Sequence, residues 1–527
     1  MSPNLNNTIY ESFIQCLKEV SPEPDPDISS ILFSSTVNTA AYTAVLQSSI
    51  RNRRFNTANT PKPAVIVTPT KEYHVQAAVI CAKKLGVQIL IRSGGHDYNG
   101  RSYVSHEQNF ILVDMYKLHN VTVDMTTETA VVQTGAQLGE LYYRIWEKSK
   151  VHGFPAGVCP TVGVGGHISG GGYGTMIRKY GLSVDQVVDA RIVDAKGRVL
   201  DRKSMGEDLF WAICGGGGAS FGVVLSYTVK LVPVPKVNTV FRITRTAAEN
   251  VTDLLYKWQL IAPTIDRDLF IRVILMPETV NNQVTVQPVF IAHFLGDSGR
   301  LLQIMSNNFP ELGLKKEDCL EVSWVESIFY WAVLDYKSPP ELLLDRHSDS
   351  VNFLIRKSDY VQTPISKSGW ASILDKLGAL GKCGLYLNPY GGIMEEIPTD
   401  ATPFPHRAGN LFKIQYSMNW SEDDPKLDEK YLHQTRILFE FMTKYVSKNP
   451  RCAFLNYRDL DIGVMHGTGV SGYNSGKVYG EKYFKGNFNR LVKVKTRVDP
   501  DNFFRTEQSI PTLPKVKNAD PVLFSRI

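Results

Sequence analysis

The chain of 527 residues exceeds the size that one hydrophobic core usually supports, so its length predicts at least two domains. Its 43% hydrophobic and 21% charged residues exclude an intrinsically disordered chain. A net charge of +6 from dispersed basic residues argues against a nucleic-acid partner. No apolar run reaches the ~18 residues that cross a bilayer, so we expect no membrane insertion.

The first half of the chain predicts a mixed α+β unit. Periodicity predicts helices over residues 10–20, 71–85 and 138–148, and strands over residues 63–68, 87–92, 109–114, 121–124 and 130–134. A proline-rich connector at residues 21–26 interrupts the pattern after the first helix, because proline cannot continue a helix.

Closely spaced prolines at residues 231–236 indicate a domain boundary. Beyond it, strands over residues 269–275 and 282–290 alternate with helices and predict an antiparallel sheet. A basic stretch at residues 490–497 alternates polar and apolar side chains, as a half-buried strand does. We expect domain limits of 1–233, 234–459 and 460–527, with the last segment rejoining the first.

Two glycine-rich segments each contain one nucleophilic side chain: His96 in residues 92–100 and Cys159 in residues 157–174. Glycine lets backbone N–H groups approach a ligand closely, which favours a large anionic cofactor. A third run, residues 214–222, also suits a pyrophosphate. It does not satisfy the G-x-G-x-x-G pattern, because Ser220 occupies the third glycine position counted from Gly215, so a nicotinamide-binding domain is disfavoured.

Six segments resemble the plant berberine bridge enzyme-like flavoproteins, and the similarity runs nearly from end to end. They are Arg-Ser-Gly-Gly-His96, Cys159-Pro-Thr-Val-Gly-Val-Gly-Gly-His, Ser-Gly-Gly-Gly-Tyr173-Gly, Gly206-Glu-Asp-Leu-Phe-Trp211, Pro-Phe-Pro-His406-Arg407 and Asn456-Tyr457-Arg458-Asp459. The resemblance implies an α+β, two-domain flavoprotein: an FAD-binding domain of the vanillyl-alcohol-oxidase/PCMH type, and a central substrate domain with an antiparallel sheet covered by helices.

The resemblance further implies that FAD is attached twice, through His96 at the 8α-methyl and through Cys159 at C6. We predict no metal site, and we expect the remaining FAD contacts at Arg92, Ser93, Gly94, Gly95, Val162, Gly165, Gly166, Ser169, Gly170, Gly172, Gly222 and Asn456. His167 is interpreted as structural.

The strand at residues 412–416 places Lys413 and Gln415 on one face, and related oxidases turn this strand toward the flavin. Tyr457 matches a family tyrosine near the flavin. We predict that Tyr457 takes the proton of a substrate hydroxyl, with Tyr98 or Tyr173 assisting, while hydride leaves carbon for flavin N5. Lys413 supplies a charge that stabilises the phenolate.

Val162 matches a family position at which a small side chain admits dioxygen. The leading hypothesis is therefore an FAD-dependent oxidase of a plant alcohol or specialised metabolite that releases hydrogen peroxide. One alternative is a redox-neutral cyclisation or cycloaddition of a phenolic metabolite on the same FAD scaffold. Another is a non-catalytic, allergen-like glycoprotein that only retains the flavin.

Cys16 and Cys81 resemble the structural disulfide pair of the family, which implies an oxidising compartment. Four Asn-x-Ser/Thr sequons, at Asn6, Asn120, Asn250 and Asn419, agree with this. We therefore expect a protein that is secreted to the apoplast or sent to the vacuole, although no signal peptide is visible. The expected partners are a small-molecule substrate and O2, and the expected state is a monomer.

Overall fold

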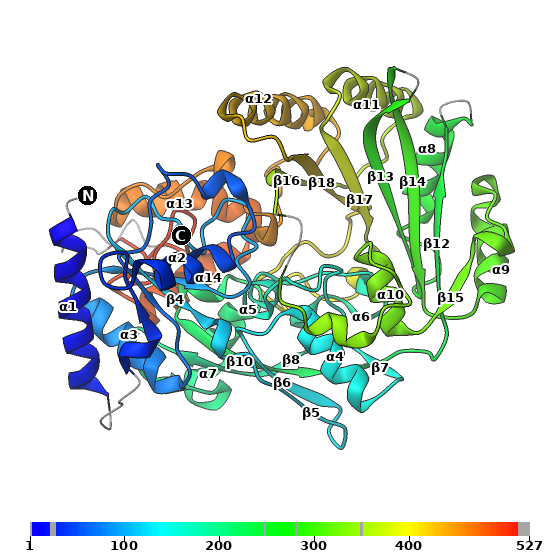
Figure 1. Cartoon of the computed structure of the whole chain (residues 1–527). Helices are drawn as coiled ribbons and strands as arrows, with labels where there is room; N and C mark the ends of the chain where they lie inside the picture. Colours follow the sequence, from blue (N-terminus) through cyan, green and yellow to red (C-terminus); the bar gives the residue numbers. More distant parts are fainter. Residues whose placement is uncertain (1–2, 22–27, 247–248, 281, 348–350, 515–527) are drawn as a thin grey trace, which may run out of the picture.

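The computed structural model describes residues 3–21, 28–246, 249–280, 282–347 and 351–514, with side chains from residue 8 onward. Most of the proline-rich connector at residues 21–26, and the side chain of Asn6, lie outside the described residues. Figure 1 shows two lobes, one built from both ends of the chain and one from its middle.

The first lobe contains two sheets. The four-stranded sheet has the order β1 (Leu32–Phe33), β2 (Val65–Val67), β4 (Phe110–Asp114), β3 (Gln88–Arg92), and β4 pairs in parallel with both β2 and β3. The five-stranded antiparallel sheet has the order β5 (Val121–Asp124), β6 (Thr129–Gln133), β10 (Val223–Lys230), β8 (Val187–Val193), β9 (Val199–Leu200). The predicted strands of this region are confirmed, with ends that differ by one or two residues.

The three helices expected here are also confirmed, as α1 (Pro3–Val20), α3 (Glu72–Lys84) and α4 (Leu138–Lys148). Helix α3 buries Val75, Ala78, Val79 and Ala82, the three-to-four spacing of one helix face. Cys16 of α1 and Cys81 of α3 form a disulfide, which confirms the pairing that the resemblance implied. The lobe also contains α2 (Thr39–Ser48), α5 (Val164–Ser169), α6 (Ile177–Tyr180), α7 (Arg202–Ile213) and the short strand pair β7 (His152–Gly153) and β11 (Val232–Pro233).

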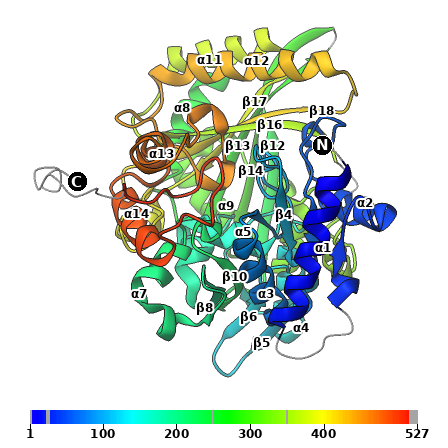
Figure 2. The same ribbon diagram turned by 90° about the vertical axis from the view of Figure 1, so that its left-hand side faces the viewer.

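The second lobe is a seven-stranded antiparallel sheet. Its order is β15 (Leu320–Val322), β12 (Asn238–Thr244), β14 (Gln283–Phe294), β13 (Leu269–Val280), β17 (Gly384–Pro389), β18 (Phe412–Trp420), β16 (Phe353–Val361). Helices α8 (Val251–Ile261), α11 (Lys367–Leu380) and α12 (Pro425–Phe441) cover one face (Figures 1 and 2), and α9 (Ser298–Asn308) and α10 (Trp324–Trp331) complete the lobe. The predicted antiparallel sheet is confirmed, and both predicted strands extend beyond their expected ends.

Strand β18 shows how this sheet builds a site. Phe412, Ile414 and Tyr416 pack into the core beneath the helices. Lys413 and Gln415 alternate with them and therefore project from the opposite face. The covered face stabilises the sheet, and the opposite face is free to present polar groups to the first lobe.

The C-terminal segment adds α13 (Gly469–Phe484) and α14 (Asn487–Val498) to the first lobe (Figure 2). One hydrophobic core joins side chains from residues 130–234 with side chains from residues 452–510, so the C-terminal segment packs against the first lobe. The strand predicted over residues 490–497 is wrong, because the stretch is helical. Phe488, Leu491, Val492 and Lys495 are buried at helical spacing, and the alternation of Val492 and Val494 with lysines obscured that period.

The domain limits at residues 234 and 460 stay predictions; β11 ends at Pro233 and β12 begins at Asn238.

Among the described residues, no helix combines the length and apolarity needed to cross a membrane. In the same part of the chain, no group of three or more His, Cys, Asp or Glu side chains could hold a metal ion.

Candidate active site

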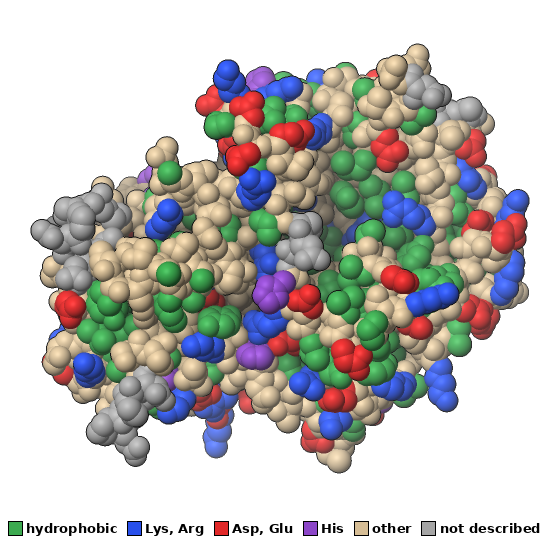
Figure 3. Space-filling model, in the orientation of Figure 1, with side chains coloured by type: hydrophobic (Ala, Val, Ile, Leu, Met, Phe, Trp, Pro, Cys, Tyr) green, Lys and Arg blue, Asp and Glu red, His purple; other side chains and the backbone are tan. Residues whose placement is uncertain are grey.

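A cavity of about 380 Å³ lies where the two lobes meet. Its walls come from the loop after β3, the Cys159 loop with α5, residues 217–222, strands β13 and β18, and the turn at residues 454–458. The space-filling view shows the surface hollowed between the lobes (Figure 3). This size and position are typical of a small-molecule or cofactor site.

The His96 and Cys159 loops are in direct backbone contact. A Cβ on Gly94 would lie 2.3 Å from the nitrogen of Gly163, and a Cβ on Gly163 would lie 2.2 Å from the nitrogen of Gly94. No side chain fits at either position, so these glycines hold the loops together. A Cβ on Gly166 would meet nothing within 4 Å, which leaves room for a ligand against the backbone there.

His96 and Cys159 contact the same hydroxyl. The Nε2 atom of His96 lies 3.0 Å from Thr161 Oγ1, and Cys159 Sγ lies 3.6 Å from that oxygen. Burial, together with the nearby Arg51 guanidinium, lowers the pKa of His96 to about 3. The imidazole is therefore neutral at physiological pH, and it retains a lone pair that can form a bond.

Four polar side chains from distant segments meet in another part of the cavity wall. The Tyr173 and Tyr457 hydroxyls share a hydrogen bond of 2.5 Å. Gln415 Nε2 of β18 donates to the Tyr98 hydroxyl at 3.1 Å. Tyr457 ends a 3-10 turn, Leu455–Tyr457, that follows the buried Phe454. The arrangement brings hydroxyls and an amide, groups that bind and deprotonate alcohols, into one cavity with His96 and Cys159.

Lys413 lies behind the tyrosines rather than in the cavity wall. Its Nζ is 3.2 Å from the ring centroid of Tyr173, 3.8 Å from that of Phe454 and 4.5 Å from that of Tyr457. It has no hydrogen-bond partner among the described residues. Burial, and secondarily Arg272, lowers the pKa of Lys413 well below its usual range, so the ammonium form is disfavoured.

Burial and the neighbouring hydroxyls of Tyr173 and Tyr98 raise the pKa of Tyr457 well above its usual range. The Arg272 guanidinium opposes this shift. Arg272 lines the cavity from β13 and donates from Nε to Asn388 Oδ1 at 2.7 Å. A guanidinium is thus the cation that favours the Tyr457 phenolate, a role that the sequence had assigned to Lys413.

Most of the predicted site residues line the cavity: Ser93, Gly94, Gly95, His96, Tyr98, Cys159, Val162, Gly165, Gly166, Ser169, Gly170, Tyr173, Gly222, Gln415, Asn456 and Tyr457. Arg92, Gly172 and Lys413 do not. Arg92 is fully buried and pairs with Asp114 at 2.5 Å, so it supports the loop from behind. A Cβ on Gly172 would lie 2.6 Å from the His167 ring, so this glycine packs against the histidine instead of the cavity.

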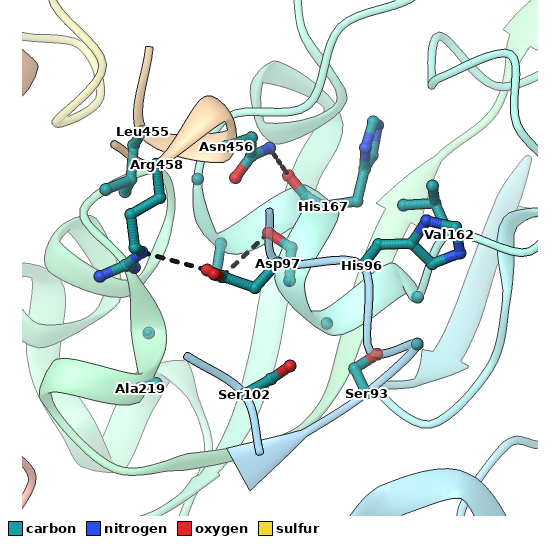
Figure 4. A pocket seen from close by; sticks show the side chains of 18 of the residues that line it. Ser93, His96, Asp97, Ser102, Val162, His167, Ala219, Leu455, Asn456 and Arg458 are labelled. Atoms are coloured by element: carbon teal, nitrogen blue, oxygen red, sulfur yellow. Dashed lines mark hydrogen bonds and ion pairs between the residues drawn. The ribbon is translucent and has the colours of Figure 1, made fainter. Parts of the chain in front are cut away.

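Sequence reasoning missed other cavity residues. Arg272 interrupts the apolar run Leu269–Leu275, and that interruption is a signal that could have identified it. Arg458, also in the cavity wall, pairs with Asp97 at 3.2 Å. Asn456 was predicted, but its partner was not: its Nδ2 donates to the His167 carbonyl at 2.9 Å (Figure 4). Nothing in the sequence links these partners, because they lie in segments far apart in the chain.

The cavity fits FAD by its own chemistry. Ser102 Oγ lines the cavity, is buried, and has no hydrogen-bond partner among the described residues, so it suits an oxygen-rich ligand. The expected phosphate run contributes Gly217, Gly218, Ala219, Ser220 and Gly222 to the wall. A neutral imidazole and a thiol lie beside this glycine-rich cradle, in which Gly166 leaves space.

Comparisons with known proteins agree with this interpretation. Residues 63–202 match the family described as FAD binding domain, and residues 453–511 match the one described as Berberine and berberine like. The chain is 55% identical to berberine bridge enzyme-like 21 of Arabidopsis thaliana, over 97% of this chain and 94% of that protein. It is 49% identical to monolignol oxidoreductase AtBBE-like 13 of the same plant, over 96% and 94%.

Among solved structures, the chain is similar to Phl p 4, a grass pollen allergen with glucose dehydrogenase activity. The TM-score is 0.89 and the identity 44%, over 95% of this chain and all of that chain. An isoleucine-to-valine variant of the allergen is described as a glucose oxidase. The chain therefore belongs to the berberine bridge enzyme-like family of FAD-dependent oxidoreductases.

Proposed function

We propose that the chain is an oxidase with a doubly attached FAD, bound through His96 and Cys159, that acts on an alcohol of a plant metabolite. The observation that carries this proposal is that one cavity contains both the His96–Cys159 pair and the Tyr173–Tyr457 pair. Because Nε2 of His96 contacts Thr161, Nδ1 is the nitrogen left for the bond to the cofactor.

The residues that hold FAD in this proposal are the glycines of both loops, the run at residues 217–222, Ser102 and Asn456. When bound, FAD supplies a two-electron acceptor that takes hydride from the substrate and is reoxidised by O2. The chain supplies orientation and proton transfer. Tyr98 and Gln415 are joined by a hydrogen bond and orient the substrate hydroxyl.

Tyr457 is the base in this proposal. Its hydroxyl lies in the cavity wall beside Tyr173, which shares the developing charge through their hydrogen bond. Arg272 stabilises that charge electrostatically. The Lys413 side chain packs behind both tyrosines, with Nζ 3.2 Å from the ring centroid of Tyr173 and 4.5 Å from that of Tyr457. Positioned acid–base groups of this kind contribute about 10²–10⁴ in rate.

Dioxygen is the proposed electron acceptor, because Val162 lines the cavity three residues after Cys159 and is a small side chain. The glucose oxidase form of Phl p 4, which differs from the dehydrogenase by a valine in place of isoleucine, supports a role for valine in oxidase activity. The activities of two relatives, a monolignol oxidoreductase and a glucose dehydrogenase, support an alcohol as the reacting group.

The disulfide between Cys16 and Cys81 supports folding in an oxidising compartment. We therefore propose a secreted or vacuolar protein that acts as a monomer on a small molecule.

The test is anaerobic mixing of the purified protein with candidate alcohols, including monolignols and sugars. An oxidase loses its flavin absorbance on mixing and regains it, with hydrogen peroxide, when air is admitted. Substrate turnover with a permanently oxidised flavin would contradict the proposal and favour redox-neutral cyclisation. A flavin that no candidate reduces, without turnover of any of them, would instead support the non-catalytic interpretation.

A further inference from the structure

The two expected attachment side chains share one structural neighbour, Thr161, which follows Cys159 by two residues and contacts both side chains. Its hydroxyl is 3.0 Å from His96 Nε2 and 3.6 Å from Cys159 Sγ. The two reactive side chains are thus no farther apart than the sum of these distances. Thr161 is buried and does not line the cavity, so it can act on the cofactor only through the residues that do.

The backbone around Thr161 is fixed on both sides. The nitrogen of Val162 donates to the Cys159 carbonyl at 3.3 Å, which closes a tight turn over Thr161. The first residues of α4 hold this turn, because Leu138 N donates to Val162 O and Gly139 N to Pro160 O. The hydroxyl therefore has a defined place between the two loops.

We propose that Thr161 positions both attachment side chains: its hydroxyl oxygen accepts a hydrogen bond from Nε2–H of His96, and its hydroxyl proton is donated to the sulfur of Cys159. The first bond leaves the lone pair of the imidazole on Nδ1, for which the described residues provide no such partner. The second fixes the sulfur of Cys159 in one orientation beside the imidazole, so that both side chains reach the same ligand. One hydroxyl satisfies both requirements, since it has one donor and two acceptor sites.

This inference rests on the proposed double attachment. Each attachment replaces one C–H bond of the cofactor by a C–N or a C–S bond and releases two protons and two electrons. One dioxygen accepts them and becomes hydrogen peroxide. Thr161 is not consumed, so its contribution is a preorganised geometry that affects how far each bond has formed in the purified protein.

The experiment compares Thr161→Val, which removes the hydroxyl at nearly constant shape, with Thr161→Ser, which retains it. Thr175→Val is the matched control, because Thr175 is also a threonine that contacts a histidine, but its Oγ1 contacts the buried His293 Nδ1 at 2.8 Å instead of His96 or Cys159. Each variant is made in a Cys159→Ala background and in a His96→Ala background, so that the two bonds are measured separately. The readout is the fraction of bound flavin that remains with the polypeptide after acid precipitation.

We expect Thr161→Val to lower that fraction roughly tenfold in both backgrounds, the effect of losing one hydrogen bond to a reacting group. Total bound flavin should be unchanged, and Thr161→Ser and Thr175→Val should match their parents. Thr161→Ala is measured in parallel, so that a misfolded valine variant leaves the test intact.

If Thr161→Val retains a fraction of acid-stable flavin within twofold of its parent in either background, the role of Thr161 is overturned. The proposed attachment would still stand. A parental chain that releases all its flavin would overturn the attachment and, with it, the role of Thr161.

Discussion

Replacing Tyr457 with phenylalanine separates catalysis from packing at the cavity. The Tyr457 ring packs against Phe454, with centroids 5.1 Å apart, and against Tyr98 at 5.6 Å. Phenylalanine keeps both contacts. The hydroxyl has a hydrogen bond to Tyr173, so its removal should cost about 1 kcal/mol of folding free energy.

The effect on chemistry should be much larger. Loss of a positioned base lowers a rate constant by about 10²–10⁴, and a thousandfold loss corresponds to about 4 kcal/mol. Flavin reduction in an anaerobic stopped-flow experiment measures that rate constant directly, and denaturant unfolding measures the stability. Tyr173→Phe is the control, since it removes the partner hydroxyl and leaves the base. Less than a tenfold loss in Tyr457→Phe, or a larger loss in Tyr173→Phe, would refute the assignment of the base.

Three further predictions concern pH, dioxygen and modification. Burial raises the pKa of Tyr457 well above its usual range. Its deprotonated fraction, and with it the rate constant of flavin reduction, should therefore rise about tenfold per pH unit from pH 6 to 9. A rate constant that does not change with pH would exclude Tyr457 as the base. Val162→Leu should slow reoxidation by air about tenfold and leave anaerobic reduction within twofold, as stopped-flow absorbance would measure; equal slowing of both would contradict a role in oxygen access. When the chain is secreted from plant cells, peptide mass spectrometry should find glycans at the exposed Asn120 and Asn250. Asn419 should stay unmodified, because its Oδ1 accepts a hydrogen bond from Arg356 at 2.7 Å. A glycan on Asn419 would contradict this prediction.

Elements with a strong local period could be predicted from the sequence. The buried strands β2, β3 and β4 are short apolar runs between turn signals, and their limits are correct within two residues. In strand β18, the alternation of side chains was enough to predict that Lys413 and Gln415 lie on one face. In α14, by contrast, the alternation of Val492 and Val494 with lysines favoured a strand, although Phe488 and Lys495 complete a helical face.

The two loops of the site were predictable because glycine runs and their reactive side chains are local in sequence. Contacts between distant segments were not. The bond from Tyr173 to Tyr457 joins residues 284 positions apart, and that from Gln415 to Tyr98 spans 317. Lys413 was identified from its strand, but its burial behind the rings, and hence its lowered pKa, depends on Phe454 and both tyrosines. Such electrostatics follow only from packing.

The most direct test of a doubly attached flavin is mass spectrometry of the denatured, proteolysed protein. We expect one cross-linked species that contains the His96 peptide, the Cys159 peptide and a single flavin. Recovery of both peptides at their unmodified masses, with all the flavin free in solution, would contradict the proposed function.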